Sequence, residues 1–207
     1  MTELFVSAFV TFLVVIDPPG CAPIFASITS GTTPQHRRAM AWRSVAIAAG
    51  ILIFFGLLGR DLLHALGISL NSFRIAGGLL LFLIAVDMVF ERRTERREDR
   101  AEEVAKEKPE DISVFPMAIP MIAGPGSIAS VMLQMSRSEG WAQYLMVWAA
   151  LGATLVLTLI CLLLAGPLMK LLGHKMEAMV TRLLGVILAA LAVQFVIDGI
   201  RRSFFGA

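Results

Sequence analysis

The stretch VVIDPPGCAPIF, residues 14–25, places an aspartate, two consecutive prolines and a glycine inside an apolar run. In a soluble protein these residues would mark an ordinary turn. Here the surrounding residues are apolar over a length sufficient to cross a bilayer. The stretch therefore predicts a membrane-spanning helix that is broken part of the way along its length.

The composition indicates an integral membrane protein with several helical spans. Of the 207 residues, 57% are hydrophobic, and the mean hydropathy is +0.77, which is too apolar for one soluble domain of this size. Several runs reach the roughly 20 residues that a helix needs to cross the hydrocarbon core. We predict an all-α membrane protein with six transmembrane helices, at about residues 4–28, 41–64, 71–90, 113–136, 141–168 and 178–201.

The placement of Lys and Arg predicts the orientation, because cytoplasmic loops carry an excess of them. If both termini lie outside, only five of the eighteen basic residues fall outside. We therefore expect a multi-pass protein of the cell inner membrane with both termini in the periplasm. The five outer residues are Arg60, Arg74, Arg137, Arg201 and Arg202.

A charged stretch divides the chain. Residues 91–112 hold seven Arg or Lys and nine Asp or Glu, whereas the spans are nearly bare of charge. We expect a first unit at 1–90, a charged cytoplasmic loop at 91–112 and a second unit at 113–207. The loop is expected to be solvated, with a helical form compatible with its sequence, and to carry no site of its own. The alternative is a docking element for a soluble partner.

The two units resemble each other in sequence. The segment FVTFLVVIDPPGCAP at 9–23 aligns with FPMAIPMIAGPGSIA at 115–129, and Arg74-x-x-Gly77 aligns with Arg182-x-x-Gly185. Each unit has three spans, so the second must enter the membrane from the opposite side. We predict two inverted three-helix repeats, which is typical of secondary transporters and also occurs in channels.

Each repeat carries one Pro-Gly break, at Pro18-Pro19-Gly20 and at Gly124-Pro125-Gly126. Proline removes a backbone donor and glycine adds backbone freedom, so the first and fourth helices are expected to be discontinuous. Such breaks are tolerated in a membrane only where protein or water covers them, which predicts a polar cavity near the midplane. Two half-helices beginning there would direct N–H groups at an anionic group such as a carboxylate. The unwound carbonyls could receive an ammonium group.

Asp17 is the one acidic residue at this depth. A carboxylate within the membrane is by default a functional candidate, and it could exchange a proton during transport. It could equally cap the half-helix that follows. Both interpretations remain open from the sequence, and Asp17→Asn separates them.

Other polar residues are weaker candidates. Arg74 and Arg182 begin the third and sixth spans and most simply anchor helix ends, with a substrate or gate role as the alternative. Asp87 and Asp198 end the same spans and are expected to be interfacial. No Cys or His spacing suggests a metal site, and we expect no cofactor.

The motifs DPPGCAPIF, RIAGGLLLFLIA and IPMIAGPGSI together resemble those of the MarC family of bacterial and archaeal membrane proteins. The resemblance covers the whole chain and implies six spans with periplasmic termini. Some archaeal relatives resemble proton- or sodium-linked transporters of small neutral amino acids. The implied substrate-binding residues are Asp17, Pro18, Pro19, Gly20 and Pro23 of the first repeat with Gly124, Pro125, Gly126 and Ser127 of the second. No acid in the second repeat matches Asp17.

Three functions are compatible with these observations. The first is a secondary transporter of a small metabolite, such as glycine or alanine, with H+ or Na+ as a coupling ion. The second is an ion or small-solute channel, and the third is a non-transporting membrane scaffold. An enzyme is not expected, because no nucleophile–base pair is visible. The expected surroundings are the lipid bilayer rather than nucleic acid, and a homo-oligomer is compatible with the sequence.

Overall fold

The computed structural model describes residues 2–107 and 111–204, and this part of the chain is helical with no strand. Three short segments lie outside the described residues, namely residues 1, 108–110 and 205–207. The first and last are at the outer limits of the predicted units, and the middle one is inside the charged stretch. The elements are α1 (Thr2–Ile16), α2 (Pro18–Ile28), α3 (Pro34–Ala65), α4 (Leu70–Val89), α5 (Arg92–Glu107), η1 (Ser113–Ile122), α6 (Pro125–Arg137), α7 (Trp141–Leu163) and α8 (Ala165–Phe204).

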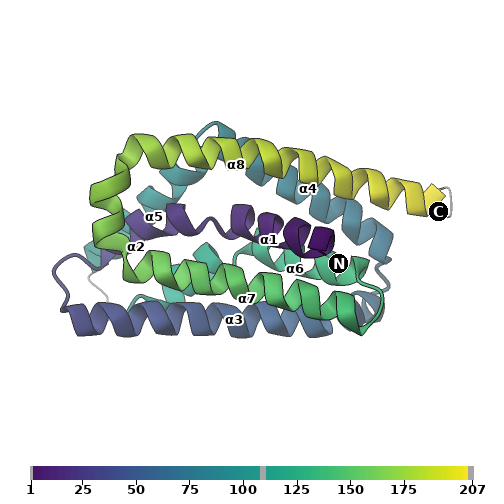
Figure 1. The fold of residues 1–207 in the computed structure, drawn as a ribbon, viewed down its shortest axis with the longest axis horizontal. Coiled ribbons are helices and arrows are strands. Elements are labelled where there is room, and N and C mark those ends of the chain that lie inside the picture. The colour runs from purple at the N-terminus through teal and green to yellow at the C-terminus, as the bar shows by residue number, and fades with distance from the viewer. Residues whose placement is uncertain (1, 108–110, 205–207) are drawn as a thin grey trace.

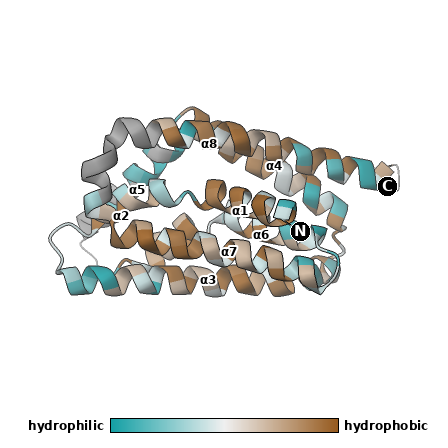
Figure 2. Cartoon of the chain, viewed as in Figure 1, coloured by the Kyte–Doolittle hydropathy of each residue, from teal (hydrophilic) through white to brown (hydrophobic). Residues whose placement is uncertain are grey.

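The length and hydropathy of the helices identify the segments that could cross a membrane. Five helices in the described part are long and apolar enough to cross a membrane, or six if the bent pair η1 and α6 forms one span. Figure 2 shows apolar residues along the middle of α3, α4, α7 and α8 and polar residues toward helix ends. The five segments are Thr2–Ile28, Pro34–Ala65, Leu70–Val89, Trp141–Leu163 and Met179–Phe204.

The helices form a bundle with the interrupted elements inside it (Figure 1). Helices α4 and α8 pack along each other on one side, and α3 and α7 lie on the other. Helix α1 lies between these pairs and contacts α6, α7 and α8. Both chain ends lie at the end of the bundle away from α5.

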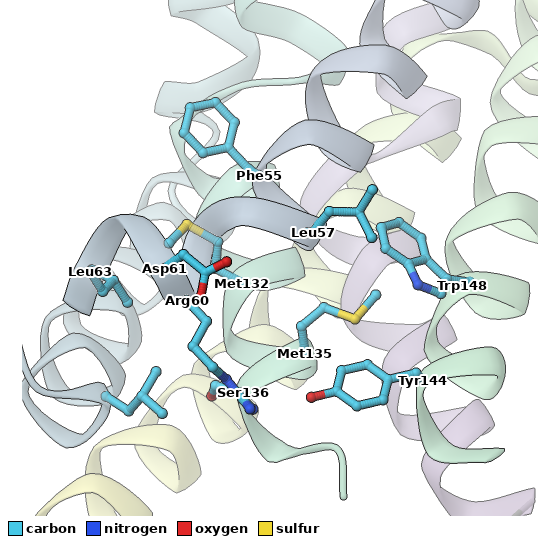
Figure 3. A pocket seen from close by; sticks show the side chains of 12 residues that line it. Phe55, Leu57, Arg60, Asp61, Leu63, Met132, Met135, Ser136, Tyr144 and Trp148 are labelled. Atoms are coloured by element: carbon cyan, nitrogen blue, oxygen red, sulfur yellow. The ribbon is translucent and has the colours of Figure 1, made fainter. Parts of the chain in front are cut away.

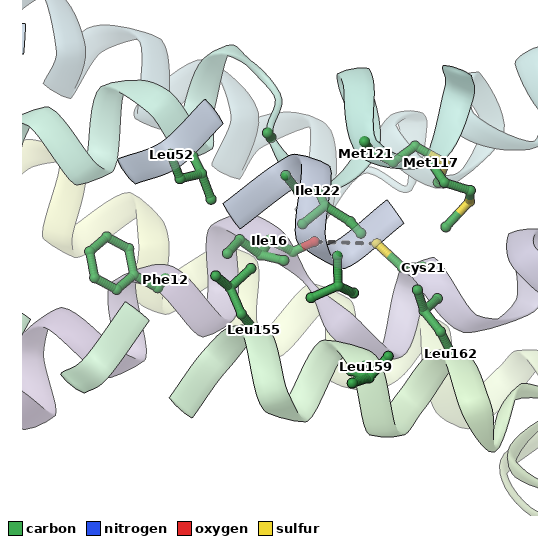
Figure 4. Close-up of a cluster of buried hydrophobic side chains, with 14 of the residues drawn as sticks. Phe12, Ile16, Cys21, Leu52, Met117, Met121, Ile122, Leu155, Leu159 and Leu162 are labelled. Atoms are coloured by element: carbon green, nitrogen blue, oxygen red, sulfur yellow. Dashed lines mark hydrogen bonds between the residues drawn. The ribbon is translucent and has the colours of Figure 1, made fainter. Parts of the chain in front are cut away.

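Two clusters of buried side chains hold the interrupted elements. One cluster joins Phe12, Ile16 and Cys21 to side chains of α3, η1 and α7 (Figure 4). The other joins Val14 and Val15 to side chains of α4, α6 and α8. The chain on both sides of Asp17 is therefore fixed by apolar packing, which keeps the break in one place.

The fourth predicted span is less regular than expected. In η1, Phe115 and Ile119 have extended backbone angles. Each precedes a proline, and a residue before proline is pushed out of the helical region. The irregularity therefore begins well before the Gly124 to Gly126 motif, and α6 leaves the break bent by 52° from η1.

Candidate functional site

Asp17 separates α1 from α2 and lies at the first break. Its backbone is left-handed, with φ 57°, and the residue is only 2% exposed. The Asp17 carboxylate accepts a hydrogen bond from the Gly20 N–H at 3.2 Å. Because Pro18 and Pro19 have no N–H, this bond satisfies the one remaining donor of the first turn of α2. The structure thus supports the capping role of Asp17.

Gly20 is required where the Asp17 side chain folds back. A Cβ atom built on Gly20 would lie 2.2 Å from Asp17 Oδ2, much closer than two such atoms can approach. A larger residue would therefore displace the carboxylate. The sequence D-P-P-G acts as one unit, in which the glycine leaves room for the acid that caps the helix.

The charged segment supplies the partner of Asp17. Arg97 of α5 donates to Asp17 Oδ2 at 3.0 Å, and both side chains are largely buried. Arg93, one turn earlier, donates to the Val15 carbonyl and to Met88 Sδ. The expectation that residues 91–112 are solvated was therefore wrong for the first turns of α5, where Arg93 and Arg97 contact the first break. Basic residues spaced four apart share one face of a helix, and here that face covers the break.

The second break has no such cap. Helix α6 begins at Pro125 after Gly124, and no side chain caps it. The N–H groups of Gly126 and Ser127 belong to the first turn of α6 and have no partner within the helix. A Cβ atom on Gly126 would meet Ile84 Cδ1 at 2.4 Å and Val15 Cγ1 at 3.3 Å. The second break therefore lies directly against the residues that precede the first.

A cavity of about 250 Å³ lies where these elements meet. Gly124, Pro125, Gly126 and Ser127 line it from α6, and Val15 lines it from α1. The α5 arginines and Asp87 of α4 line the rest of its polar wall, and Pro116, Pro120 and Met121 of η1 line its apolar side. The cavity thus joins an uncapped helix N-terminus to guanidinium groups.

The predicted site residues divide into two groups. The second-repeat residues Gly124 to Ser127 all line the cavity. The first-repeat residues Asp17, Pro18, Pro19, Gly20 and Pro23 do not line it and lie in or beside the first turns of α2. The expectation that both half-helices direct free N–H groups at one region fails for α2, because its prolines lack donors and Asp17 takes the remaining one.

Sequence reasoning missed the cavity residues Arg93, Arg96 and Arg97. Their spacing of three and four residues, directly after an apolar span, is a helical pattern that could have been recognised. Pro116 and Pro120 were missed as well, although their separation by four residues places them near one face of a helical segment. Asp87, expected to be interfacial, lines the cavity and accepts from Arg96 at 2.6 Å.

The cavity carries excess positive charge. Arg96 pairs with Asp87 and Arg97 pairs with Asp17, whereas Arg93 donates to two uncharged acceptors, Met88 Sδ and the Val15 carbonyl. Burial, and then the nearby charge of Arg97, lower the pKa of the Arg93 guanidinium to about 10, so Arg93 remains protonated at neutral pH. One positive charge and the N-terminus of α6 together favour a small anionic group.

The weaker candidates lie elsewhere. Arg182 pairs with Glu91 at the α5 end of the bundle. Arg74 and Asp198 lie toward the opposite end, where Asp198 pairs with Arg137. Within the described residues, no group of three or more His, Cys, Asp or Glu side chains could hold a metal ion.

Comparison with known proteins identifies relatives that are membrane proteins. Residues 2–204 match the family described as MarC family integral membrane protein. A UPF0056 membrane protein of Methanocaldococcus jannaschii is 35% identical over 199 residues, covering 96% of this chain and 97% of that protein. YhgN, a UPF0056 inner membrane protein of Escherichia coli, is 34% identical over 203 residues, covering 97% and 98%. YvbG, a UPF0056 membrane protein of Bacillus subtilis, is 31% identical over 205 residues, covering 99% and 97%. No solved structure matches the chain. The chain belongs to the MarC family of integral membrane proteins.

Proposed function

We propose that this protein is a secondary transporter of a small neutral amino acid, such as glycine or alanine, working by alternating access. The observation that carries the proposal is the cavity between the uncapped N-terminus of α6 and the α5 arginines. The amino-acid carboxylate would accept from the Gly126 and Ser127 N–H groups and from Arg93. Asp87, which also lines the cavity, offers an acceptor for the ammonium group.

The size of the cavity supports a small substrate. Sites for drug-sized ligands enclose roughly 300–1,000 Å³, and this cavity encloses about 250 Å³. Ser127 at the α6 side of the cavity is 3% exposed, whereas the side chain of Arg96 is 67% exposed, so the cavity is closed at α6 and open at α5. A metabolite of a few heavy atoms fits this volume better than an antibiotic does.

Helix packing supports the inverted repeat on which alternating access would depend. Helices α1 and α2 pack against α7, and the corresponding elements η1 and α6 pack against α3. Helices α4 and α8 pack against each other. Exchanging the two halves maps the α1 and α2 contacts with α7 onto the η1 and α6 contacts with α3, and it maps the α4–α8 pair onto itself, as a two-fold axis within the bundle would.

The proposed cellular context is the inner membrane, with α5 in the cytoplasm and both termini in the periplasm. The relative YhgN is named an inner membrane protein. Arg43 and Arg182 pair with acids flanking α5, so these basic residues gather at the α5 end. The substrate would then meet the cavity from the cytoplasm in the conformation described.

The roles within the site follow from the contacts. Gly124, Pro125, Gly126 and Ser127 would bind the substrate directly, with Arg93 as the charged group. Asp17, Pro18, Pro19, Gly20 and Pro23 would hold the first break and, through Arg97, the position of α5. Asp17 remains the candidate for proton coupling, and Asp17→Asn should abolish the pH dependence of transport if it carries the proton.

Counterflow in proteoliposomes tests the proposal. Vesicles loaded with unlabelled glycine or alanine should transiently accumulate the labelled amino acid from outside. Arg93→Gln should weaken this uptake by about tenfold, the effect of losing one charge-assisted contact. The matched control is Arg92→Gln, which removes the exposed neighbouring charge and should leave counterflow intact.

Other outcomes assign other functions. Ionic currents without counterflow would indicate a channel, and the absence of both would indicate a scaffold. Equal loss in Arg92→Gln and Arg93→Gln would show that overall charge on α5, rather than the cavity contact, governs uptake.

A further inference from the structure

A second cavity lies at the end of the bundle away from α5. It encloses about 660 Å³ and is lined by residues of α3, α4, α6, α7 and α8. Arg74 of this cavity and Asp87 of the first lie thirteen residues apart on α4, about 20 Å along the helix. The two cavities therefore lie at opposite ends of the molecule and do not share a wall.

Three arginines from three helices converge on this second cavity. Arg60 comes from α3, Arg74 from α4 and Arg202 from α8. An adjoining pocket of about 210 Å³ shares Arg60, Leu70, Ser136 and Tyr144 with it. Figure 3 shows that the side chains of Arg60, Ser136 and Tyr144 point into the same space.

Arg74 is held as a rigid part of the cavity wall. It is 3% exposed and donates to the Ser136 carbonyl at 2.7 Å, to Ser136 Oγ at 3.3 Å and to Asn71 Oδ1 at 3.2 Å. All three acceptors are uncharged. A guanidinium has five N–H donors, so two remain beyond these bonds. A buried charge without a counter-ion is costly, and an anion in the cavity would supply one.

The positive charge of this cavity is not neutralised within the described residues. Glu139 lines the cavity and Asp61 lines the adjoining pocket, but no ion pair joins either of them to the three arginines there. Asp198, the other nearby acid, pairs with Arg137. Three arginines against Glu139 leave a net positive charge of two facing the cavity.

We propose that this cavity is a second binding site, for an oxyanion group such as a phosphate or carboxylate. Arg74 forms the fixed floor, and the exposed Arg60 and Arg202 close on the anion from α3 and α8. Arginine suits such a group because its planar fork binds two oxygens at once. The group can belong to a free solute or to a lipid headgroup, and the site is independent of the proposed transport.

Calorimetric titration of the purified protein in a neutral detergent tests this site. Inorganic phosphate and succinate are titrated separately, with ionic strength held constant by sodium chloride. We expect saturable binding that weakens at least about tenfold in Arg202→Gln. The matched control is Arg201→Gln, which removes the neighbouring charge on α8 but does not line the cavity.

A second arm identifies the source of the group. The wild type and both variants are placed in nanodiscs of phosphatidylcholine with or without phosphatidylglycerol, and Tm is measured, because a ligand bound to the folded state raises its stability. If phosphatidylglycerol raises Tm in the wild type and Arg201→Gln but not in Arg202→Gln, the ligand is a headgroup. If only the soluble anions bind, the ligand is a free solute.

Arg74→Lys keeps the charge but loses the planar guanidinium. This variant serves as a control in which weaker binding cannot be explained by a buried position left without its positive charge. It should run as a single species in gel filtration and bind the anion more weakly than the wild type. The proposal is overturned if neither soluble anions nor phosphatidylglycerol distinguish the wild type from Arg202→Gln, or if Arg201→Gln loses binding equally.

Discussion

Asp17 links the first break to the charged helix α5 through one carboxylate. One oxygen accepts from the Gly20 N–H and the other accepts from Arg97. The side chain therefore satisfies a backbone donor that α2 would otherwise leave open, and it neutralises a largely buried guanidinium. The sequence left capping and proton coupling equally open; the contacts support the first and leave the second as a prediction.

Asp17→Asn should destabilise the protein even though the amide oxygen can still cap α2. The variant leaves Arg97 without a counter-charge in a site where its side chain is 12% exposed. Breaking a buried pair in this way typically costs about 3–5 kcal/mol. Thermal unfolding in detergent measures the loss.

The double variant Asp17→Asn/Arg97→Gln provides the control for this pair. It removes the orphaned charge, so it should unfold at a higher temperature than Asp17→Asn alone. The wild type, Asp17→Asn, Arg97→Gln and the double variant form a double-mutant cycle. If the losses of stability in the two single variants add up to the loss in the double variant, the two side chains do not interact.

Gly20→Ala should also destabilise, because the added methyl group would collide with the Asp17 carboxylate. We expect a cost of about 1–3 kcal/mol, typical of overpacking. Gly152→Ala is the matched control, since nothing lies within 4 Å of a Cβ at that exposed position of α7. Alanine favours the helix there by about 1 kcal/mol. Thermal unfolding measures the stability of both variants. Equal unfolding temperatures for Gly20→Ala and Gly152→Ala would contradict the crowding at Gly20.

Helix α5 shows what sequence patterns could and could not reveal. Hydropathy and the prolines predicted the membrane spans, because these depend on local composition. The contact of Arg97 with Asp17 joins residues 80 positions apart, and nothing local encodes such a distance. The difference between the capped α2 and the uncapped α6 could have been predicted from the sequence, because Asp17 precedes the first break whereas Gly124, which has no side chain to cap a helix, precedes the second.

Docking of α5 depends on Arg93 and Arg97, and this can be measured by hydrogen exchange. In Arg93→Gln/Arg97→Gln, the amides of α5 should exchange at least about tenfold faster, because two charge-assisted contacts to the break are lost. Arg92→Gln, whose side chain is exposed, should exchange like the wild type. Unchanged exchange in the double variant would show that apolar contacts alone hold α5.

The whole molecule has two unlike ends. At one end lie α5 and the ion pairs Arg43–Asp111 and Arg182–Glu91. At the other lie the chain termini (Figure 1) and the cavity with Arg60, Arg74 and Arg202. The charge count from the sequence assigned these same residues to opposite sides, although the side chains of Lys170 and Lys175 lie outside the described residues. The structure shows which residues share an end, and the direction of the bundle in the membrane stays a prediction.

Cysteine labelling in intact cells determines that direction. Glu98 of α5 and Glu139 between α6 and α7 are both exposed and lie at opposite ends. In a background with Cys21 and Cys161 replaced by alanine, Glu139→Cys should react with a membrane-impermeant maleimide in intact cells. Glu98→Cys should react only after the cells are permeabilised, because positive charge holds its end in the cytoplasm. The reversed pattern would place α5 and its arginines in the periplasm, and the first cavity would then receive substrate from outside the cell.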